Sequence, residues 1–318
     1  MTELLRSIDE RTRLAGANQL EILLFSIGTE TQSGKNEVYG INVFKVREVM
    51  HIPEITRAPD MPDSIEGMVS LRGTTIPVIN LAKFCGINTE EEVTKLIVTE
   101  YNDHVQGLLV HSVDCIKRLD WGDVKTPPSM IAKKNAGLVT AVSESDDHGI
   151  IMILDVEMVL AKAAGLYDDE HLFSEIPEIE DSIHMLVADD STVARRQITT
   201  TLDKMGITYT VAANGKEAWS KLLKITEQAS AANQPVSHYI QYILTDVEMP
   251  EMDGYVLTQK IKKDSRFKDI PIIMHSSLSA DQNKLLGEGV GADVYVAKFK
   301  PQELANAITK LISETKEK

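Results

Sequence analysis

The fold of the C-terminal half of this chain follows from residues 243–254, which have the sequence Ile-Leu-Thr-Asp-Val-Glu-Met-Pro-Glu-Met-Asp-Gly. Together with the β-prone run at 239–242, the first residues of this stretch predict a buried strand. Asp246 stands where the apolar run stops, and the Met-Pro and Asp-Gly pairs after it are turn signals. The pattern therefore places Asp246 at the carboxyl end of a strand, where open α/β sheets carry their ligand sites.

A single aspartate at such a position is more often a residue that caps a turn. A second apolar run at 183–188, however, ends in the adjacent acids Asp189 and Asp190. Neighbouring carboxylates repel each other unless a cation or solvent relieves them. With Asp246 from another strand they would form an all-oxygen site of the kind that suits Mg²⁺.

Two further apolar runs end in polar residues. Residues 270–275 precede Ser276, and residues 292–297 precede Lys298. An amphipathic pattern over 193–205, stopped by a glycine, predicts a helix between the first two strands. Acids, a hydroxyl and an ammonium group thus all follow strands within one segment, which predicts one site at one edge of a sheet.

In these motifs residues 183–318 resemble a response-regulator receiver domain, whose fold is a doubly wound arrangement of five βα units around a central parallel sheet. The resemblance implies that Asp246 is the phospho-acceptor. It also implies that Mg²⁺ is held by Asp189, Asp190, Asp246 and the backbone carbonyl of Glu248. This assignment agrees with the chemistry, because phosphoryl transfer to a weak carboxylate nucleophile depends on positioning and charge neutralisation.

The same resemblance implies that Ser276 and Tyr295 form the switch pair and that Lys298 contacts the phosphoryl group. A phosphoryl group adds charge and acceptor oxygens, toward which a serine hydroxyl can move while the tyrosine fills its place. Considered alone, Ser276 and Tyr295 are more often a loop hydroxyl and a core aromatic residue.

Three features depart from the usual receiver pattern. Lys298 is followed by Phe-Lys-Pro, whereas most receivers have proline directly after the lysine, so this loop can differ in shape. His275 replaces an apolar residue, and we expect it to be a partly exposed histidine at a strand end. Residues 226–235 form an insertion that carries no chemical motif, and we expect it to extend the preceding helix before a loop.

The N-terminal half has a different pattern of predicted secondary structure. An amphipathic pattern predicts a short helix within residues 1–17, and another helical pattern covers residues 155–164. Between them lie short β-prone runs separated by turn signals, at 20–27, 38–43, 67–71, 75–79, 95–100, 105–110, 137–142 and 149–154. Many short strands with such spacing predict an all-β barrel or paired barrels.

Residues 65–81 carry the pattern Gly-x-x-x-Leu-Arg-Gly-x-x-Ile-Pro-Val. Through it, and through residues 44–49, the segment from about 18 to 165 resembles a CheW-type coupling domain, whose fold is a pair of small SH3-like β-barrels. Leu71-Arg72-Gly73 is expected to be a hairpin turn, with Gly73 permitting the tight backbone. An exposed Arg72 is either a solvated side chain or a partner contact. The resemblance favours a partner-binding region that comprises Val69, Leu71, Arg72 and Gly73.

Composition limits the remaining function classes. The 318 residues carry a net charge of −15, with 43% hydrophobic and 25% charged residues. Residues 166–182 contain seven acids and no lysine or arginine, whereas Lys+Arg and Asp+Glu balance in residues 183–318. We therefore divide the chain into a coupling domain (1–165), a solvated acidic linker (166–182) and a receiver domain (183–318). No basic face suggests nucleic-acid binding.

The absence of a long apolar run argues against membrane insertion, and an acidic start argues against a signal peptide. Two cysteines without metal-like spacing predict reduced thiols and a cytoplasmic location. No catalytic constellation or glycine-rich nucleotide loop is found, so the protein is expected to be no enzyme beyond Mg²⁺-dependent self-phosphorylation and self-dephosphorylation.

The order of the two domains resembles the CheV family of chemotaxis proteins. The resemblance implies an adaptor that couples methyl-accepting chemoreceptors to a histidine autokinase at receptor arrays on the inner face of the membrane. Other coupling proteins are further candidate partners. Two alternatives stay open: a phosphate sink that drains the kinase, and a static scaffold with an inactive receiver.

Overall fold

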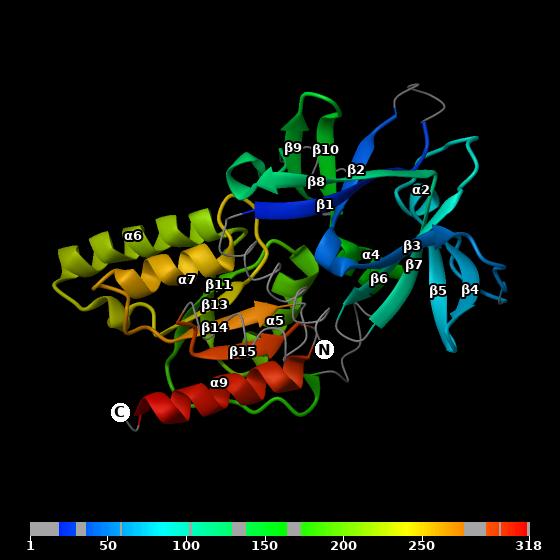
Figure 1. Cartoon of the computed structure of the whole chain (residues 1–318). Coiled ribbons are helices and arrows are strands. Elements are labelled where there is room, and N and C mark those ends of the chain that lie inside the picture. The colour runs from blue at the N-terminus through cyan, green and yellow to red at the C-terminus, as the bar shows by residue number, and fades with distance from the viewer. Residues whose placement is uncertain are drawn as a thin grey trace, which may run out of the picture. The chain divides into compact units, whose positions relative to one another are not determined.

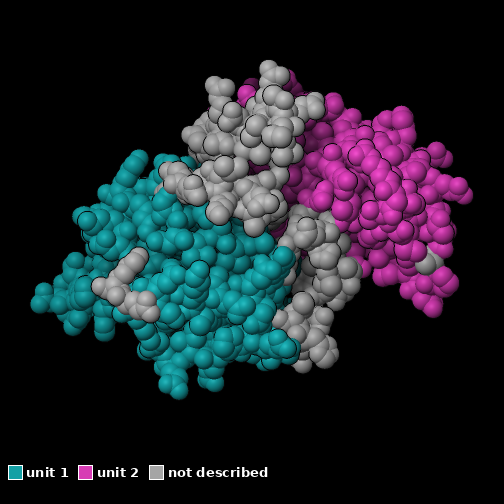
Figure 2. All heavy atoms as spheres, turned by 60° about the horizontal axis from the view of Figure 1, so that its bottom comes forward, with its two compact units in different colours: residues 1–19, 169–318 teal, residues 20–168 magenta. Residues whose placement is uncertain are grey.

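The computed structural model describes residues 19–29, 36–57, 59–101, 104–128, 138–163, 173–276, 291–298 and 300–316. The chain separates into two compact units, one spanning Leu20–Asp168 and the other containing Asp169–Lys318 (Figure 2). The helix expected within residues 1–17 lies outside the described residues.

The first unit is built on two five-stranded β-sheets (Figure 1). One has the order β8-β1-β2-β10-β9, formed by Ser112–Asp120, Gln19–Ser26, Val38–Asn42, Gly149–Leu154 and Val139–Ser145. The other has the order β3-β6-β7-β5-β4, formed by Val46–His51, Lys95–Tyr101, His104–Val110, Thr74–Asn80 and Ile65–Leu71. The short helices are α2 (Leu81–Phe84) and α4 (Val156–Ala163). Each sheet packs its own apolar core, which confirms the β-rich prediction.

The second unit is a parallel sheet with the order β12-β11-β13-β14-β15. These strands are Thr208–Ala212, His184–Ala188, Tyr242–Asp246, Ile272–Ser276 and Val294–Ala297. All four pairings are parallel. The order reverses at β11, so β11 and β13 are neighbours whose connections leave in opposite directions, and ligand sites form at such a point.

Helices cover both faces of this sheet. Core residues of α5 (Thr192–Lys204) and α9 (Pro301–Lys316) pack on one face, and those of α6 (Gly215–Ala232) and α7 (Gly254–Lys263) pack on the other. Residues 277–290, where a receiver's helix between β14 and β15 is expected, lie outside the described residues. None of the helices described here has the length and hydropathy needed to cross a bilayer.

The structure confirms the expectation for the insertion at residues 226–235 but contains a strand that the sequence pattern did not predict. The insertion does extend α6, which runs to Ala232 and ends at Asn233 in the left-handed conformation (φ 52°). By contrast, β12 is an additional strand that the sequence pattern did not reveal. Only Ala212 among its five residues is fully buried, because β12 lies at the edge of the sheet. An edge strand with exposed polar residues gives little hydrophobic signal.

The described part of the acidic linker, residues 173–182, is not simply solvated. Ile176 and Ile179 pack against the core formed by α5, α9 and the sheet. The Ile179 amide donates a hydrogen bond to the Met205 carbonyl oxygen at 2.9 Å. Two isoleucines spaced three residues apart thus pack, partly buried, on the core of the unit to which they belong. The acids around them, Glu175, Glu178 and Glu180, are exposed, so the prediction of a solvated linker does not describe the two isoleucines.

Candidate functional site

Three carboxylates meet at the carboxyl edge of the parallel sheet. Asp246 is the last residue of β13, and Asp189 directly follows the adjacent β11, whose Ala188 lies opposite Thr245. With Asp190, each contributes an oxygen to a group whose members lie within 4.8 Å of one another. Asp189 and Asp246 are 0% and 3% exposed, so their charges have little access to solvent.

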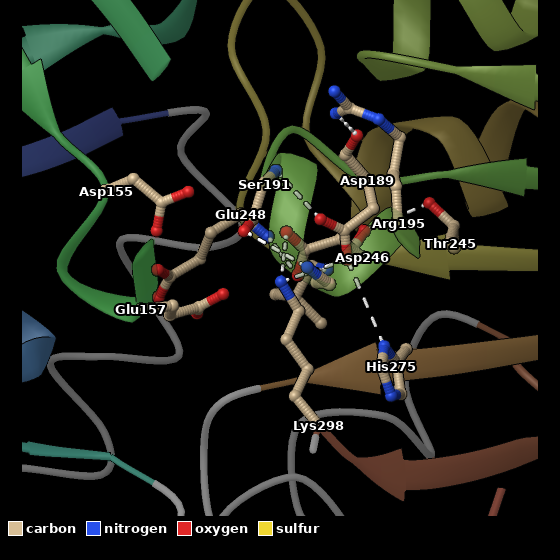
Figure 3. A network of polar contacts seen from close by, with 12 residues as sticks. Asp155, Glu157, Asp189, Ser191, Arg195, Thr245, Asp246, Glu248, His275 and Lys298 are labelled. Carbon is tan, nitrogen blue, oxygen red and sulfur yellow. Dashed lines mark hydrogen bonds and ion pairs between the residues drawn. The ribbon is translucent and has the colours of Figure 1, made fainter. Parts of the chain in front are cut away.

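Lys298 reaches this cluster from the end of β15 (Figure 3). Its Nζ lies 3.0 Å from Asp189 Oδ2 and 2.9 Å from Asp246 Oδ2, and the residue is only 1% exposed. A buried ammonium group is stable only with such partners. Lys298 supplies one ammonium group beside three carboxyl groups, so the cluster remains rich in acidic oxygens.

The Asp246 carboxylate is held from its other side by backbone amides. Its Oδ1 accepts hydrogen bonds from the amides of Val247 at 2.7 Å and Glu248 at 3.3 Å. Its Oδ2 faces Lys298 instead. The two oxygens therefore have different environments: one is fixed by the chain, and the other faces a cation.

The loop after Asp246 depends on Gly254, whose importance the sequence indicated only as a turn signal. The Gly254 amide donates to the Val247 carbonyl oxygen at 2.9 Å. A Cβ at this position would overlap the backbone carbonyl oxygen of Asp246. The start of α7 can therefore pass directly against the candidate acceptor only because residue 254 has no side chain.

Asp253 caps the same helix. Its Oδ1 accepts a hydrogen bond from the Val256 amide at 2.7 Å. The residue is 2% exposed, and this burial raises the pKa of its carboxyl group to about 6 although backbone amides of Val256 and Tyr255 act in the opposite direction.

His275 is buried, and the expectation of a partly exposed histidine is wrong. It is 1% exposed, and its Nδ1 lies 4.0 Å from Asp189 Oδ2. The reason is that β14 continues to Ser276 and is flanked on both sides, with His275 opposite Asp246 on β13 and Val296 on β15. The imidazole is thus part of the surroundings of the acidic cluster, as Figure 3 shows.

Ser276 and Tyr295 lie on the neighbouring strands β14 and β15. Ser276 ends its strand, is 2% exposed and lies opposite Ala297. Tyr295 lies opposite Met274 and packs partly buried beside it. Ser276 therefore ends the strand next to β13, and Tyr295 lies one strand further away, on β15.

The predicted partner-binding residues divide into two pairs. Arg72 and Gly73 form the two-residue turn between β4 and β5, both with positive φ (50° and 85°), and the Arg72 side chain is 73% exposed. Val69 is 2% exposed and Leu71 packs against the same core. A direct partner contact by Val69 is therefore contradicted, because alternation along β4 directs residues 69 and 71 to the inner face.

Comparison with known proteins agrees with this architecture. Residues 21–164 match the CheW-like domain family, and residues 185–309 match the response regulator receiver domain family. The chain is 31% identical over 309 residues to chemotaxis protein CheV3 of Helicobacter pylori, covering 93% of this chain and 96% of CheV3. Chemotaxis protein CheV2 of the same organism is 26% identical over 328 residues, covering 98% and 100% of the two chains.

Single-domain relatives match each half separately. Chemotaxis protein CheW of Klebsiella aerogenes is 29% identical over 144 residues, 44% of this chain and 81% of that protein. A receiver domain of a Pseudomonas aeruginosa sensor histidine kinase, solved with magnesium coordinated in its active site cleft, is 25% identical (TM-score 0.33) and covers 42% of this chain and 99% of its own. The chain therefore belongs to the CheV family, in which a CheW-like domain joined to a response regulator receiver domain forms a chemotaxis coupling adaptor regulated by receiver phosphorylation.

Proposed function

We propose that Asp246 is the residue that accepts the phosphoryl group, and that the donor is the phosphohistidine of the chemotaxis histidine autokinase. The observation that supports this most strongly is the bridge formed by Lys298, whose buried ammonium group contacts both Asp189 and Asp246. A fixed cation beside a carboxylate at a strand end can stabilise charge that develops on a transferring phosphoryl group.

The donor set fits Mg²⁺. Asp189, Asp190 and Asp246 supply hard oxygen ligands at one point, and acidic oxygens outnumber the single ammonium group of Lys298 there. We assign the backbone carbonyl of Glu248 as a further ligand, since this residue is already held beside Asp246 by its amide. When bound, Mg²⁺ would neutralise charge on the phosphoryl oxygens.

Different residues of the chain have different roles in phosphoryl transfer. The amides of Val247 and Glu248 hold Asp246 Oδ1, which leaves Oδ2 as the nucleophile beside Lys298. A bond forms between Oδ2 and phosphorus as the phosphorus–nitrogen bond to the kinase histidine breaks, and that nitrogen keeps the electron pair and takes up a proton. Lys298 then contacts the new phosphoryl group, and hydrolysis by water returns the carboxylate.

The effect of phosphorylation at Asp246 is transmitted by residues on the neighbouring part of the sheet. Ser276 moves toward the phosphoryl group, and Tyr295 changes position with it. Output reaches the chemoreceptors and the kinase through the coupling domain, with Arg72 and Gly73 as the exposed contact. We place the protein in the cytoplasm at receptor arrays and keep the domain division 1–165, 166–182 and 183–318 as part of this proposal.

A phosphotransfer time course tests the proposal. Labelled kinase is mixed with wild-type protein or with Asp246→Asn, with and without Mg²⁺. Label is expected only on the wild type and only with Mg²⁺. Transfer to Asp246→Asn at the wild-type rate would disprove the assignment. The decay rate of the label separates a lasting switch from a phosphate sink, because a sink must lose its label quickly.

A further inference from the structure

A second cluster of metal-binding side chains lies in the coupling unit. Asp114 and Cys115 are on β8, and His148 is in the turn between β9 and β10. Each offers one ligand atom, and these atoms lie within 4.8 Å of one another. His148 Nε2 is 2.9 Å from Asp114 Oδ2, and Cys115 carries a free thiol.

Contacts around Cys115 and His148 limit where these two side chains can lie. Cys115 and Lys117 are two residues apart and so share a face of β8. Lys117 Nζ donates a hydrogen bond to Ser145 Oγ at 2.5 Å, which ties that face to the start of the turn. Gly149 lies opposite Ser145 and has a positive φ of 67°, which closes the turn that presents His148.

We propose that Asp114, Cys115 and His148 bind a thiophilic divalent cation of the Zn²⁺ class. Zn²⁺ takes thiolate, imidazole and carboxylate ligands in tetrahedral geometry, and three protein ligands leave one position for water or for a donor of a partner. The mixed sulfur, nitrogen and oxygen set differs from the all-oxygen cluster around Asp246, so the two sites select different metals. Binding of the cation would therefore change the charge and the available ligand positions on this part of the coupling-domain surface.

Co²⁺ is a suitable probe, because its thiolate complexes absorb in the near ultraviolet and its four-coordinate complexes in the visible. Chelator-treated full-length protein is titrated with Co²⁺, and then Zn²⁺ is added to displace it. We expect one equivalent with a thiolate band, displacement by Zn²⁺ and no effect of excess Mg²⁺. Cys115→Ser and His148→Asn each remove a direct ligand and should weaken Co²⁺ binding by at least about ten-fold. Even mutations of residues that only hydrogen-bond to a metal ligand lower metal affinity by about 10–100-fold.

Asp147→Asn is the matched control. Asp147 is an exposed acid in the same turn, 82% exposed in its side chain and 4.0 Å from Lys117, and it does not belong to the cluster. This variant should bind Co²⁺ like the wild type. A titration without a thiolate band, or an unchanged band in Cys115→Ser, would overturn the proposal. Circular dichroism of each variant confirms that the protein is folded before titration.

An independent observation concerns Tyr255 in the receiver unit. This residue, at the start of α7, is 5% exposed and packs with Val247, Met274 and Tyr295. The hydroxyl groups of Tyr255 and Tyr295 are both buried, and neither has a hydrogen-bond partner among the described residues. Buried hydroxyls normally have partners, so two such groups in one small cluster call for an explanation.

The surroundings of Tyr255 connect it to the acidic site. Val247, with which it packs, is the residue directly after Asp246. Burial raises the pKa of the Tyr255 phenol, and the nearby Tyr295, Glu248, Asp253 and Asp246 raise it further. The group therefore stays protonated, and it is available as a donor to an acceptor that a rearrangement brings near.

We infer that Tyr255 is a positioning residue of the switch: its hydroxyl has no partner among the described residues in this state and gains one when the edge formed by β13, β14 and β15 rearranges on phosphorylation. This inference rests on the proposed function of Asp246. This switch role can be distinguished from a purely structural one. A structural hydroxyl of Tyr255 would stabilise the unphosphorylated protein, whereas a buried hydroxyl without a partner destabilises it.

The test uses Mg²⁺ with beryllofluoride, a stable mimic of the phosphoryl group, and follows thermal unfolding of the full chain. Tyr255→Phe should unfold at a higher temperature than the wild type without the mimic. Its further rise with the mimic should be at most about half that of the wild type, since it cannot form the new hydrogen bond. Tyr209→Phe, which loses a hydroxyl that bonds Asp203 at 3.3 Å outside the cluster, should keep the full response.

The outcomes separate the two claims. If the wild type does not respond to Mg²⁺ and beryllofluoride, the proposed function of Asp246 fails. If the wild type responds and Tyr255→Phe responds equally, only the inference about Tyr255 fails. A Tyr255→Phe protein that unfolds at a lower temperature without the mimic would indicate a structural hydroxyl and also contradict the inference.

Discussion

The two units place their charged residues in opposite ways. In the receiver unit Asp189, Asp246 and Lys298 are at most 3% exposed and neutralise one another in part. In the coupling unit Arg72 extends from a turn with its side chain 73% exposed, and it pairs with Glu48 at 2.9 Å. Burial strengthens electrostatic effects on a reacting group, whereas a partner contact must be reachable. A buried charge should therefore matter for stability and chemistry together, and an exposed one for binding alone.

The largest effect is expected for Lys298→Met. Removing one member of a buried ion pair leaves uncompensated charge, which costs about 3–5 kcal/mol of stability. Loss of the phosphoryl contact should also slow phosphorylation about 100-fold or more. Urea unfolding and phosphotransfer rates measure the two effects. Lys310→Met is the control, because Lys310 is 78% exposed beside Glu314 at 3.8 Å and its loss should change stability by less than about 0.5 kcal/mol.

Asp253→Asn should change how stability depends on pH. The folded-state pKa of Asp253, about 6, is above its ordinary 3.8, so the folded protein holds this proton more tightly than the unfolded chain. The protonated Asp253 carboxyl group therefore stabilises the folded protein, and this contribution is fully present below about pH 4. It is lost as the pH rises through 6, which lowers the free energy of unfolding by about 3 kcal/mol. Asparagine keeps the helix cap without titrating.

Urea unfolding of the wild type and Asp253→Asn at several pH values between 4 and 7, followed by the helical circular-dichroism signal, measures this difference. The variant should gain relative stability as the pH rises. Parallel profiles for the two proteins would show that Asp253 does not titrate in this range.

A somewhat smaller effect is expected for Gly254→Ala. The added methyl group must displace the backbone at Asp246, and such overpacking costs about 1–3 kcal/mol. Phosphorylation should slow as well, since the acceptor loses its position. Gly122→Ala provides the comparison in the coupling unit, where a Cβ would meet no atom within 4 Å. Equal stability of the two variants would contradict the close approach at Gly254.

The smallest effect on stability is expected for Arg72→Ala. An exposed ion pair contributes at most about 1 kcal/mol. Binding to receptor–kinase complexes should nevertheless weaken, by about 2 kcal/mol if Arg72 is a central contact. Arg57→Ala is a matched control, because Arg57 is 81% exposed and pairs with Glu66 at 3.3 Å. Sedimentation with receptor-containing membranes compares the variants, and equal binding by both would exclude a special role for Arg72.

The sequence predicted those parts of the site that local pattern determines. Apolar runs ending in Asp189, Asp246 and Lys298 are signals within a few residues, and parallel topology brings such ends together. The Arg72-Gly73 turn was predictable for the same reason. These features need no knowledge of how distant segments pack.

Other features depend on how the chain packs in three dimensions. His275 is buried because β13 and β15 flank it, and Gly254 is required because Asp246 passes beside it. The partner of Ile179 is Met205 across the unit, so composition alone suggested a solvated linker. Strand β12 was missed because an edge strand with one buried residue lacks a hydrophobic pattern.

Direct mapping of the phosphoryl group tests the central claim. The wild-type protein is phosphorylated by the kinase with Mg²⁺, and the acyl phosphate is reduced with borohydride, which converts a phosphorylated aspartate to homoserine. Peptide mass spectrometry then locates the change. We predict homoserine at position 246 and none in Asp246→Asn carried through the same steps. Homoserine at another aspartate in the wild type, with Asp246 unmodified, would contradict the account.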